Sequence, residues 1–185
     1  AKAGKLRDES VLRSQVRRPG DWQVKVPKVA PGGWAFEYKN YFYPDTDDTA
    51  VALIILSQFR DDPKWKAKGI EEAIRLGVDW LTAMQCKGGG WGACDKDNDK
   101  KILTKIPFCD FGEALDPPSV DVTAHIIEAF GKLGYDQSHP AMRRAIDWTL
   151  KEQEKDGSWF GRWGVNYIYG TGAVLPALEA IGFDM

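Results

Sequence analysis

The feature that most constrains the fold of this chain is a repeat built around its tryptophans. Trp91 and Trp159 lie 68 positions apart, and each follows a glycine-rich turn. The same spacing separates two further pairs of identical residues: Gln85 and Gln153, and Trp80 and Trp148. Agreement of several positions at one spacing is typical of proteins that stack copies of one supersecondary unit. A weaker third copy is predicted at Gln15 and residues 20–22, where Ser10 takes the place of the upstream tryptophan.

Two kinds of helix are predicted to alternate along the chain. Residues 49–56, 123–130 and 171–178 are apolar nearly all round, which is typical of helices buried on all sides. Gly134 and Gly182 are placed to end the last two of these, and Pro176 is expected to bend or interrupt the third. By contrast, two segments carry one apolar stripe, typical of half-exposed helices: residues 142–149, and the stripe of Ile70, Ala73, Ile74, Gly77, Leu81 and Met84.

This alternation predicts an all-α fold, part of an α/α barrel (a toroid) with an inner ring of buried helices and an outer ring facing water. Sustained strand-type alternation is missing, and residues 22–29 are expected to form an extended loop. Three inner and two or three outer helices do not close a ring. We therefore expect residues 1–185 to form a partial barrel domain within a longer protein.

Charge and cysteine content exclude several classes of protein. Lys and Arg number 25 against 27 Asp and Glu, so the basic excess typical of nucleic-acid binding is missing. The longest uncharged apolar run is far shorter than the roughly 20 residues of a membrane-spanning helix. We expect neither such a helix nor a signal peptide. Three cysteines without a CxxC motif suggest reduced thiols in a cytoplasmic setting.

Three carboxylates, those of Asp45, Asp47 and Asp48, open the first inner helix. One aspartate is enough to cap a helix, so a cluster of three exceeds that role. Close carboxylates that are partly buried do not all ionise, and one tends to hold a proton. The cluster is therefore a candidate general acid, with a plain helix cap as the equal alternative.

Aligned at a spacing of 74, the first two inner helices place His125 opposite the acids. Asp47 matches Asp121, Thr49 matches Thr123, and Val51 matches His125. Parallel inner helices would let His125 reach the cluster, although a lone histidine can also be a core residue. The other histidine, His139, is expected to face solvent.

Metal binding is the rival explanation of the acids. The carboxylates could hold Mg²⁺, but they lack a glycine-rich phosphate cradle and grouped basic residues. Residues 95–99 resemble the start of a calcium loop, but Lys100 and Ile106 stand where glycine and glutamate are needed. The cysteines and His125 lack paired zinc spacing. We expect no metal site, and a polar turn at 95–99.

Aromatic side chains are expected near the start of the inner helices: Trp34, Phe36, Phe108, Phe111, Trp163 and Tyr169. Each aromatic face attracts a cation by about 0.5 to 2 kcal/mol. An acid at the end of an aromatic cavity suits a carbocation reaction, while simple packing is the alternative for each ring.

These motifs resemble those of squalene–hopene cyclases, the bacterial class II triterpene cyclases. Residues 45–50, DTDDTA, resemble the DxDD motif, and residues 85–91 and 153–159 resemble the repeated Gln–Trp motifs. Residues 106–113 and 161–172 also resemble this family, and their match is more specific still. The resemblance covers residues 20–185, with 1–19 a weakly matched lead-in. It implies an internal part of the catalytic barrel domain, with the rest of the barrel and the second domain outside this chain.

The resemblance also implies a role for each matching residue. Asp47 would protonate the terminal alkene of squalene, with Asp45 and Asp48 as neighbours, and the imidazolium of His125 would raise its acidity. The remaining positions would surround the substrate: Tyr169 in the hydrogen-bond network, Phe36 and Trp163 beside the cations, and Phe108 and Cys109 at the entrance constriction. Cys94 also lines this cavity, but the family has an aromatic residue there, and Glu37 stands where the family has an amide. Such chemistry requires no metal and no cofactor.

For the whole protein, the resemblance implies cyclisation of squalene, or a similar linear polyene, to hopene or hopanol. It implies a monotopic protein on the cytoplasmic side of a bacterial membrane, able to form a homodimer, without a nucleic-acid partner. This chain alone is expected to be inactive. Two other hypotheses remain open: a protein prenyltransferase β-like barrel, which needs zinc, and a non-catalytic helical-repeat binding module.

Overall fold

The computed structural model describes residues 10–37, 40, 42–100 and 115–184, and this part of the chain is helical. The long helices are α2 (Thr46–Ser57), α4 (Ile70–Met84), α5 (Val120–Lys132), α6 (Pro140–Lys151) and α7 (Asn166–Ala180). Short helical turns complete it: α1 (Ser10–Ser14), the 3-10 helix η1 (Asp21–Val24) and α3 (Pro63–Lys66). The all-α prediction is confirmed. The expectation of an extended loop over residues 22–29 was wrong at its start, where η1 lies.

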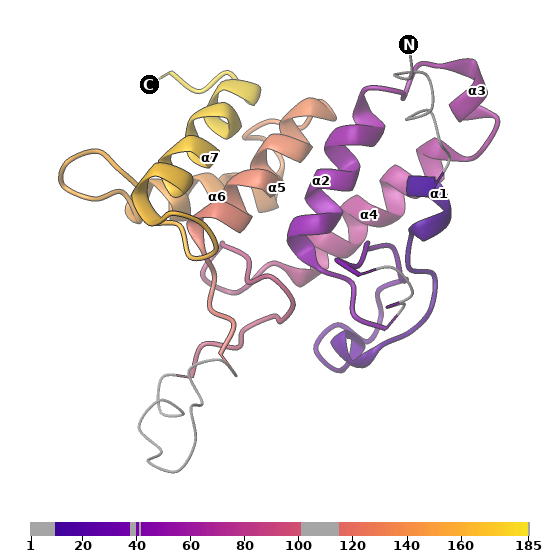
Figure 1. Cartoon of the computed structure of the whole chain (residues 1–185), viewed down its shortest axis with the longest axis horizontal. Coiled ribbons are helices and arrows are strands. Elements are labelled where there is room, and N and C mark those ends of the chain that lie inside the picture. Colours follow the sequence, from indigo (N-terminus) through magenta and orange to yellow (C-terminus); the bar gives the residue numbers. More distant parts are fainter. Residues whose placement is uncertain (1–9, 38–39, 41, 101–114, 185) are drawn as a thin grey trace.

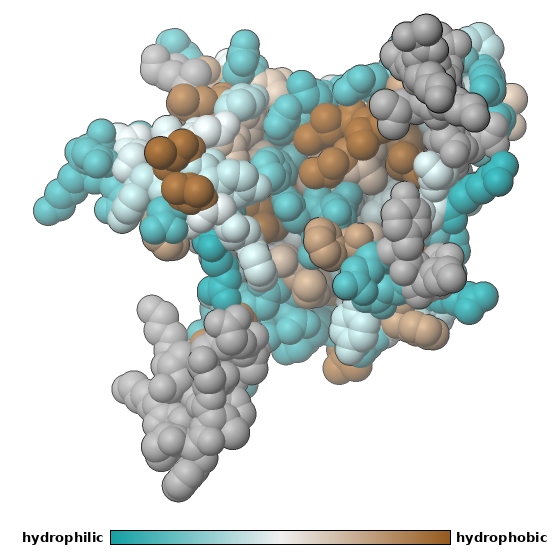
Figure 2. Space-filling model, viewed as in Figure 1, coloured by the Kyte–Doolittle hydropathy of each residue, from teal (hydrophilic) through white to brown (hydrophobic). Residues whose placement is uncertain are grey.

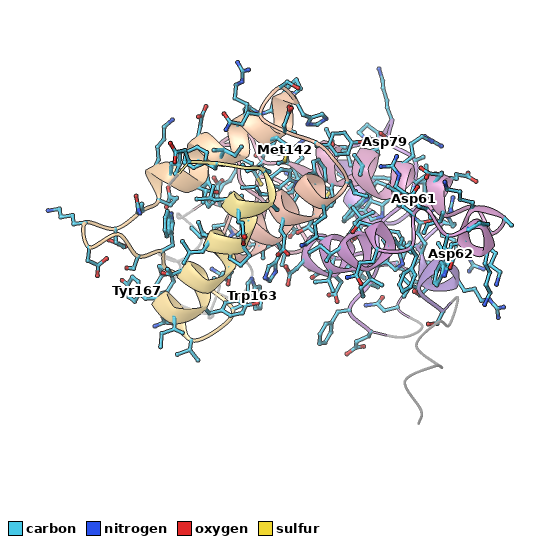
Figure 3. The ribbon with its side chains drawn as sticks, turned by 90° about the horizontal axis from the view of Figure 1, so that it is seen from above. Asp61, Asp62, Asp79, Met142, Trp163 and Tyr167 are labelled. Atoms are coloured by element: carbon cyan, nitrogen blue, oxygen red, sulfur yellow. The ribbon has the colours of Figure 1, made fainter. Side chains whose placement is uncertain are left out.

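The helices form two layers. In the first, α5 packs between α2 and α7 (Figure 1). In the second, α4 packs on α2 and α6 packs on α5. Seen from above, Asp79 of α4 and Met142 of α6 lie toward one side of the molecule, and Trp163, just before α7, and Tyr167, at the start of α7, lie toward the other (Figure 3). Inner and outer helices therefore alternate along the chain, as predicted.

Local sequence explains where these helices begin and end. The predicted stripe of α4 is buried along its whole length. Gly134 and Gly182 follow α5 and α7 with φ of +89° and +63°, the left-handed conformation that ends helices. Of the two effects expected of Pro176, to bend or to interrupt the third inner helix, interruption does not occur, because α7 runs through it to Ala180.

The inner helices were expected to be buried on all sides, and α5 meets this expectation better than α2 and α7 do. Helix α2 exposes Val51 and Ile55, at 42% and 38%, and α7 exposes Leu175 at 43%. Brown, apolar side chains lie on the corresponding face over α2 and α7 (Figure 2). The physical reason is that α5 has an inner helix on each side, whereas α2 and α7 each have one in the described part of the chain.

The tryptophan repeat is a recurring set of hydrogen bonds. The Gln85 side chain donates to the carbonyl of Gly89 and to that of Ala141, in the first turn of the next outer helix, at 2.7 and 2.8 Å. The Trp91 indole donates back to Leu81 at 2.7 Å, and its backbone N–H donates to Thr123 Oγ1 of the next inner helix at 3.0 Å. Each unit thus ties an outer helix to the inner helix that follows it.

Trp159 repeats this pattern. Its indole donates to the carbonyl of Thr149, and its backbone N–H donates to Thr171 Oγ1. The third copy ends at Trp34 and not at Trp22, which corrects the predicted register. The Trp34 indole donates to Val11 at 2.7 Å and its backbone N–H to Thr49 Oγ1 at 2.8 Å. An insertion that contains η1 separates Gln15 from Trp34, and Trp22 instead packs edge-on against Trp80.

Candidate active site

The acid cluster lies at the N-terminus of α2 and is braced by the repeat. Asp45 is the N-cap, and its Oδ1 accepts the backbone N–H of Asp48 at 2.9 Å. The Asp45 backbone N–H donates to the carbonyl of Trp34 at 2.7 Å, and the hydroxyl of Thr49 donates to the Asp45 carbonyl at 2.6 Å. The buried loop that contains Trp34 therefore fixes the position of the start of α2, where the acids lie.

Burial changes the acidity of this cluster. It raises the pKa of Asp45 to about 7, and the charges of Asp48 and Asp47 act in the same direction against the hydrogen bond from the Asp48 N–H. Burial, together with the charge of Asp47, also raises the pKa of Asp48. Near neutral pH the cluster therefore retains a proton, as close and partly buried carboxylates should.

His125 of α5 reaches the cluster. A hydrogen bond of 2.6 Å joins its Nδ1 to Oδ1 of Asp47, with the two side chains 21% and 34% exposed. This bond raises the pKa of His125 against the opposing effect of burial, so it favours an imidazolium that donates to the carboxylate. The prediction that parallel inner helices bring these residues together is confirmed.

The pair lies beside an apolar cavity between α5 and α7. Tyr169 packs edge-on against the His125 ring, with their centroids 6.1 Å apart. The cavity has a volume of about 350 Å³ and is lined by His125, Val165, Ile168, Tyr169, Gly172 and Ala173. Burial, and then the charges of Asp47 and Asp121, raise the pKa of Tyr169, which keeps its hydroxyl protonated.

The other predicted lining residues are placed differently. The Trp163 backbone N–H donates to Asp121 Oδ2 at 2.8 Å, and its ring is 60% exposed below the guanidinium of Arg162. Phe36 is 80% exposed, so the structure does not pack it against the acids.

Cys94 and Trp34 both lie next to Asp45. The Cys94 thiol is 3.5 Å from Asp45 Oδ2. Trp34 lies at the start of the first inner helix, as expected, and is buried as part of the repeat, which is the simple-packing alternative for its ring. Phe108, Cys109 and Phe111 lie outside the described residues.

Other polar groups have structural roles. His139, expected to face solvent, is partly buried at the start of α6, where its ring packs against Phe130 and Tyr135. Residues 95–99 form the expected polar turn, in which Asp97 accepts the backbone N–H of Lys87. Within the described ranges, no three His, Cys, Asp or Glu side chains are grouped to hold a metal.

Sequence reasoning missed two acids that organise the site, Asp116 and Asp121. Asp116 accepts three consecutive backbone N–H groups of the loop before residue 96. Asp121, the repeat equivalent of Asp47, is 1% exposed and holds the loop of Trp163. Only Asp121 had a signal in the sequence, since it aligned with Asp47 without a role assigned to it.

Known proteins with a similar sequence place this arrangement in a family. The sequence profile described as the squalene-hopene cyclase C-terminal domain matches residues 3–185. The squalene–hopene cyclase of Alicyclobacillus acidocaldarius is 51% identical over 174 residues, which are 94% of this chain and 27% of that protein. That of Zymomonas mobilis is 48% identical over 86% of this chain and 24% of its own length.

A solved structure, of a protein from Actinoplanes, shares the fold. It has a TM-score of 0.54 and 20% identity over 86% of this chain and 43% of its own. The chain spans about a quarter of the length of the cyclases that it matches. With a family match over nearly its whole length and about half of its residues identical to those cyclases, the chain belongs to the squalene–hopene cyclase C-terminal domain family.

Proposed function

We propose that this chain is the acid-bearing part of a class II triterpene cyclase, which protonates squalene and cyclises it through carbocations to hopene or hopanol. One observation carries the proposal: the 2.6 Å contact of Asp47 with His125, beside two further carboxylates and an apolar cavity. The names of the similar cyclases support it. They do not favour a prenyltransferase-like barrel or a binding module.

The proposed reaction begins when the proton that the acid cluster retains on its neighbouring carboxyls moves to Asp47. Its proton moves to the terminal carbon of the alkene, whose electron pair forms the new C–H bond and leaves a tertiary cation. The next alkenes attack in turn, closing the rings. The His125 imidazolium stabilises the carboxylate left on Asp47, because opposite charges in a water-poor site attract strongly. The last cation loses a proton, or adds water and then loses one, so a proton returns to the medium and the acid can be regenerated.

Aromatic groups complete the proposed site. Trp163 and Phe36 would stabilise developing cations, Tyr169 would orient the His125 ring, and Phe108 and Cys109 would form the entrance constriction. Other walls of the cavity would come from parts of the barrel outside these residues. We therefore propose that the longer protein, and not this chain alone, is the catalyst.

The substrate also suggests where the protein acts. Squalene is a hydrocarbon that dissolves in lipid and not in water, so we infer uptake from the cytoplasmic side of a bacterial membrane by a monotopic protein that is able to form a homodimer. Among the helices described, none is long and apolar enough to span a bilayer. Flotation of the longer protein with lipid vesicles tests this; a protein that remains entirely in the lipid-free fraction would contradict it.

Conversion of squalene by the longer protein in detergent, followed by gas chromatography and mass spectrometry, tests the activity. We expect a pentacyclic product, reduced at least about a hundredfold by Asp47→Asn, since a positioned general acid contributes on that scale. Asp79→Asn is the matched control, because the Asp79 side chain is exposed on α4 and forms an ion pair with Arg75 of the same helix. Full turnover by a folded Asp47→Asn variant would exclude Asp47 as the acid. A folded parent without any cyclised product would leave the cluster as a helix cap.

A further inference from the structure

The N-terminus of α2 is held from a second side, by a loop of the next repeat. The backbone N–H of Thr46 donates to the Ala93 carbonyl, and the Thr46 hydroxyl donates to the Gly92 carbonyl, both at 2.7 Å. The thiol of Cys94 donates to Asp45 Oδ2 at 3.5 Å. Thr46 is fully buried. Residues 92–94 therefore contact both residues that precede Asp47.

One carboxylate holds this loop in turn. Asp116 accepts the backbone N–H groups of Ala93, Cys94 and Asp95 at 3.0, 2.6 and 2.7 Å. A Cβ atom at Gly92 would lie 2.5 Å from the Asp116 carbonyl oxygen, so only glycine allows the loop to approach this closely. Hydrogen bonds to an ionised acceptor are short and strong, so three on one side chain fix the loop firmly.

We propose that Asp116 is a positioning residue for the acid cluster: it fixes residues 92–95, which orient Asp45 and Thr46 at the start of α2. Asp116 lies just ahead of α5, the helix that carries His125. Asp116 and residues 92–95 together therefore fix the position of the start of α2 relative to α5, and with it the contact between Asp47 and His125. The consequence for turnover rests on the proposed function, whereas the link from Asp116 to Asp45 does not.

The surrounding charges give this link a measurable signature. Asp45 faces Asp47 and Asp48 on α2 and Cys94 on the loop, and Cys94 in turn lies near Asp95 and Asp116. Burial, and then the charge of Asp45, raise the pKa of Cys94 to about 12, so the thiol stays protonated and can donate. Its hydrogen bond lowers the pKa of Asp45. Loss of the loop geometry should therefore lower the pKa of Cys94 and raise the pKa of Asp45.

Two measurements on the longer protein test the proposal with Asp116→Asn, whose amide nitrogen cannot accept an N–H. Alkylation of Cys94 by iodoacetamide at pH 8.5, quantified by peptide mass spectrometry, needs no turnover, and we expect its rate to rise at least about threefold, since the thiolate is the nucleophile. In squalene cyclisation we expect kcat to fall about 10- to 100-fold, as for a misplaced catalytic group. The inflection of the pH profile should move to higher pH. Asp95→Asn is the matched control: its charge, like that of Asp116, raises the pKa of Cys94, but its backbone N–H keeps the bond to Asp116. Its alkylation rate should rise less than that of Asp116→Asn, and its kcat should stay unchanged.

A folded Asp116→Asn variant with unchanged Cys94 alkylation and pH profile would overturn the proposal. If this variant does not fold, Asp45→Asn replaces it in the alkylation assay, where an unchanged rate would break the link from Cys94 to Asp45. Cys94→Ala should move the pH inflection upward and Cys94→Ser, which keeps a donor, should not; identical profiles would count against the link. If the parent yields no cyclised product, the proposed function fails while alkylation still decides the positioning role.

Discussion

The bond between His125 and Asp47 joins an imidazole and a carboxylate from different helices, and its strength should depend on pH. Since this bond raises the pKa of His125, the folded protein binds that proton more tightly than the unfolded chain does. The stabilisation is complete below the ordinary histidine pKa of 6.5 and is lost as pH rises through the higher pKa of the folded state.

His125→Gln should therefore be more destabilising in acid than in base. At pH 5.5 we expect its free energy of unfolding to be about 1.5 to 3 kcal/mol below that of the unaltered protein, the range for hydrogen bonds to charged groups. At pH 9 the gap should narrow. Urea denaturation at both values measures it, and a gap independent of pH would reduce His125 to a packing residue.

Asp45 gives the same direction with pH but the opposite effect of substitution, because burial raises its pKa from 3.8 to about 7. Between these values the folded state holds a proton that the unfolded chain releases, so stability falls as pH rises through this window. Asn caps helices as well as Asp does and carries no charge. Asp45→Asn should therefore stabilise the protein at pH 8 by about 1 to 2 kcal/mol, allowing for partial solvent screening.

Near pH 4 the Asp45→Asn variant and the unaltered protein should unfold at nearly the same urea concentration, because Asp45 is then largely neutral. Cyclisation should decrease in the same variant. A variant less stable than the parent at pH 8 would show that the Asp45 charge supports the fold.

The repeat explains why one pair of site residues was predictable and another acid was not. Asp47 and His125 occupy matched helices at a fixed spacing, so their proximity follows from the parallel inner helices. Asp116 binds three backbone N–H groups, which every sequence supplies. Its position before Pro117 carries no pattern, and only the folded loop shows its role.

Among elements, those defined by local periodicity were predicted best. The stripe of α4 and the glycines after α5 and α7 depend on neighbours within one or two turns. The third copy of the tryptophan repeat was misplaced because an insertion separates Gln15 from Trp34, while Trp22 offered a spacing closer to that of the other copies. The exposure of Val51 and Ile55 depends on what packs beside α2, which its own sequence does not specify.

The threonines of the inner helices offer a test of the repeat itself. Thr123 and Thr171 accept the same bond, from Trp91 and Trp159, but Thr123 is fully buried and Thr171 is half-buried. Thr123→Val leaves a buried N–H without an acceptor, so the free energy of unfolding should fall by about 1 to 3 kcal/mol. Thr171→Val should cost less, because water can replace the hydroxyl. Equal losses in urea denaturation would show that the backbone bond is not what holds the units together.

At the scale of the whole molecule, the two inner helices that flank α5 both expose apolar side chains: Val51 and Ile55 of α2, and Ile168 and Leu175 of α7. Figure 2 shows apolar patches over α2 and α7. Exposed apolar patches mark a binding groove or an interface. In the proposed enzyme these patches line a closed cavity, and exclusion of water there gives the charges of Asp47 and His125 their full effect.

Patches of this kind should make residues 1–185, expressed alone, self-associate. We expect oligomers by size-exclusion chromatography with light scattering, and a shift toward monomer when Val51 and Ile55 are both replaced by Ser. Val24→Ser is the matched control: Val24 is 82% exposed on η1, so its loss should leave association unchanged. In the longer protein the double substitution should be harmful. It should lower cyclisation without improving solubility, because the same side chains would line the substrate cavity. A monomeric chain, or a longer protein indifferent to the double substitution, would contradict the assignment of these patches to the interior of a barrel.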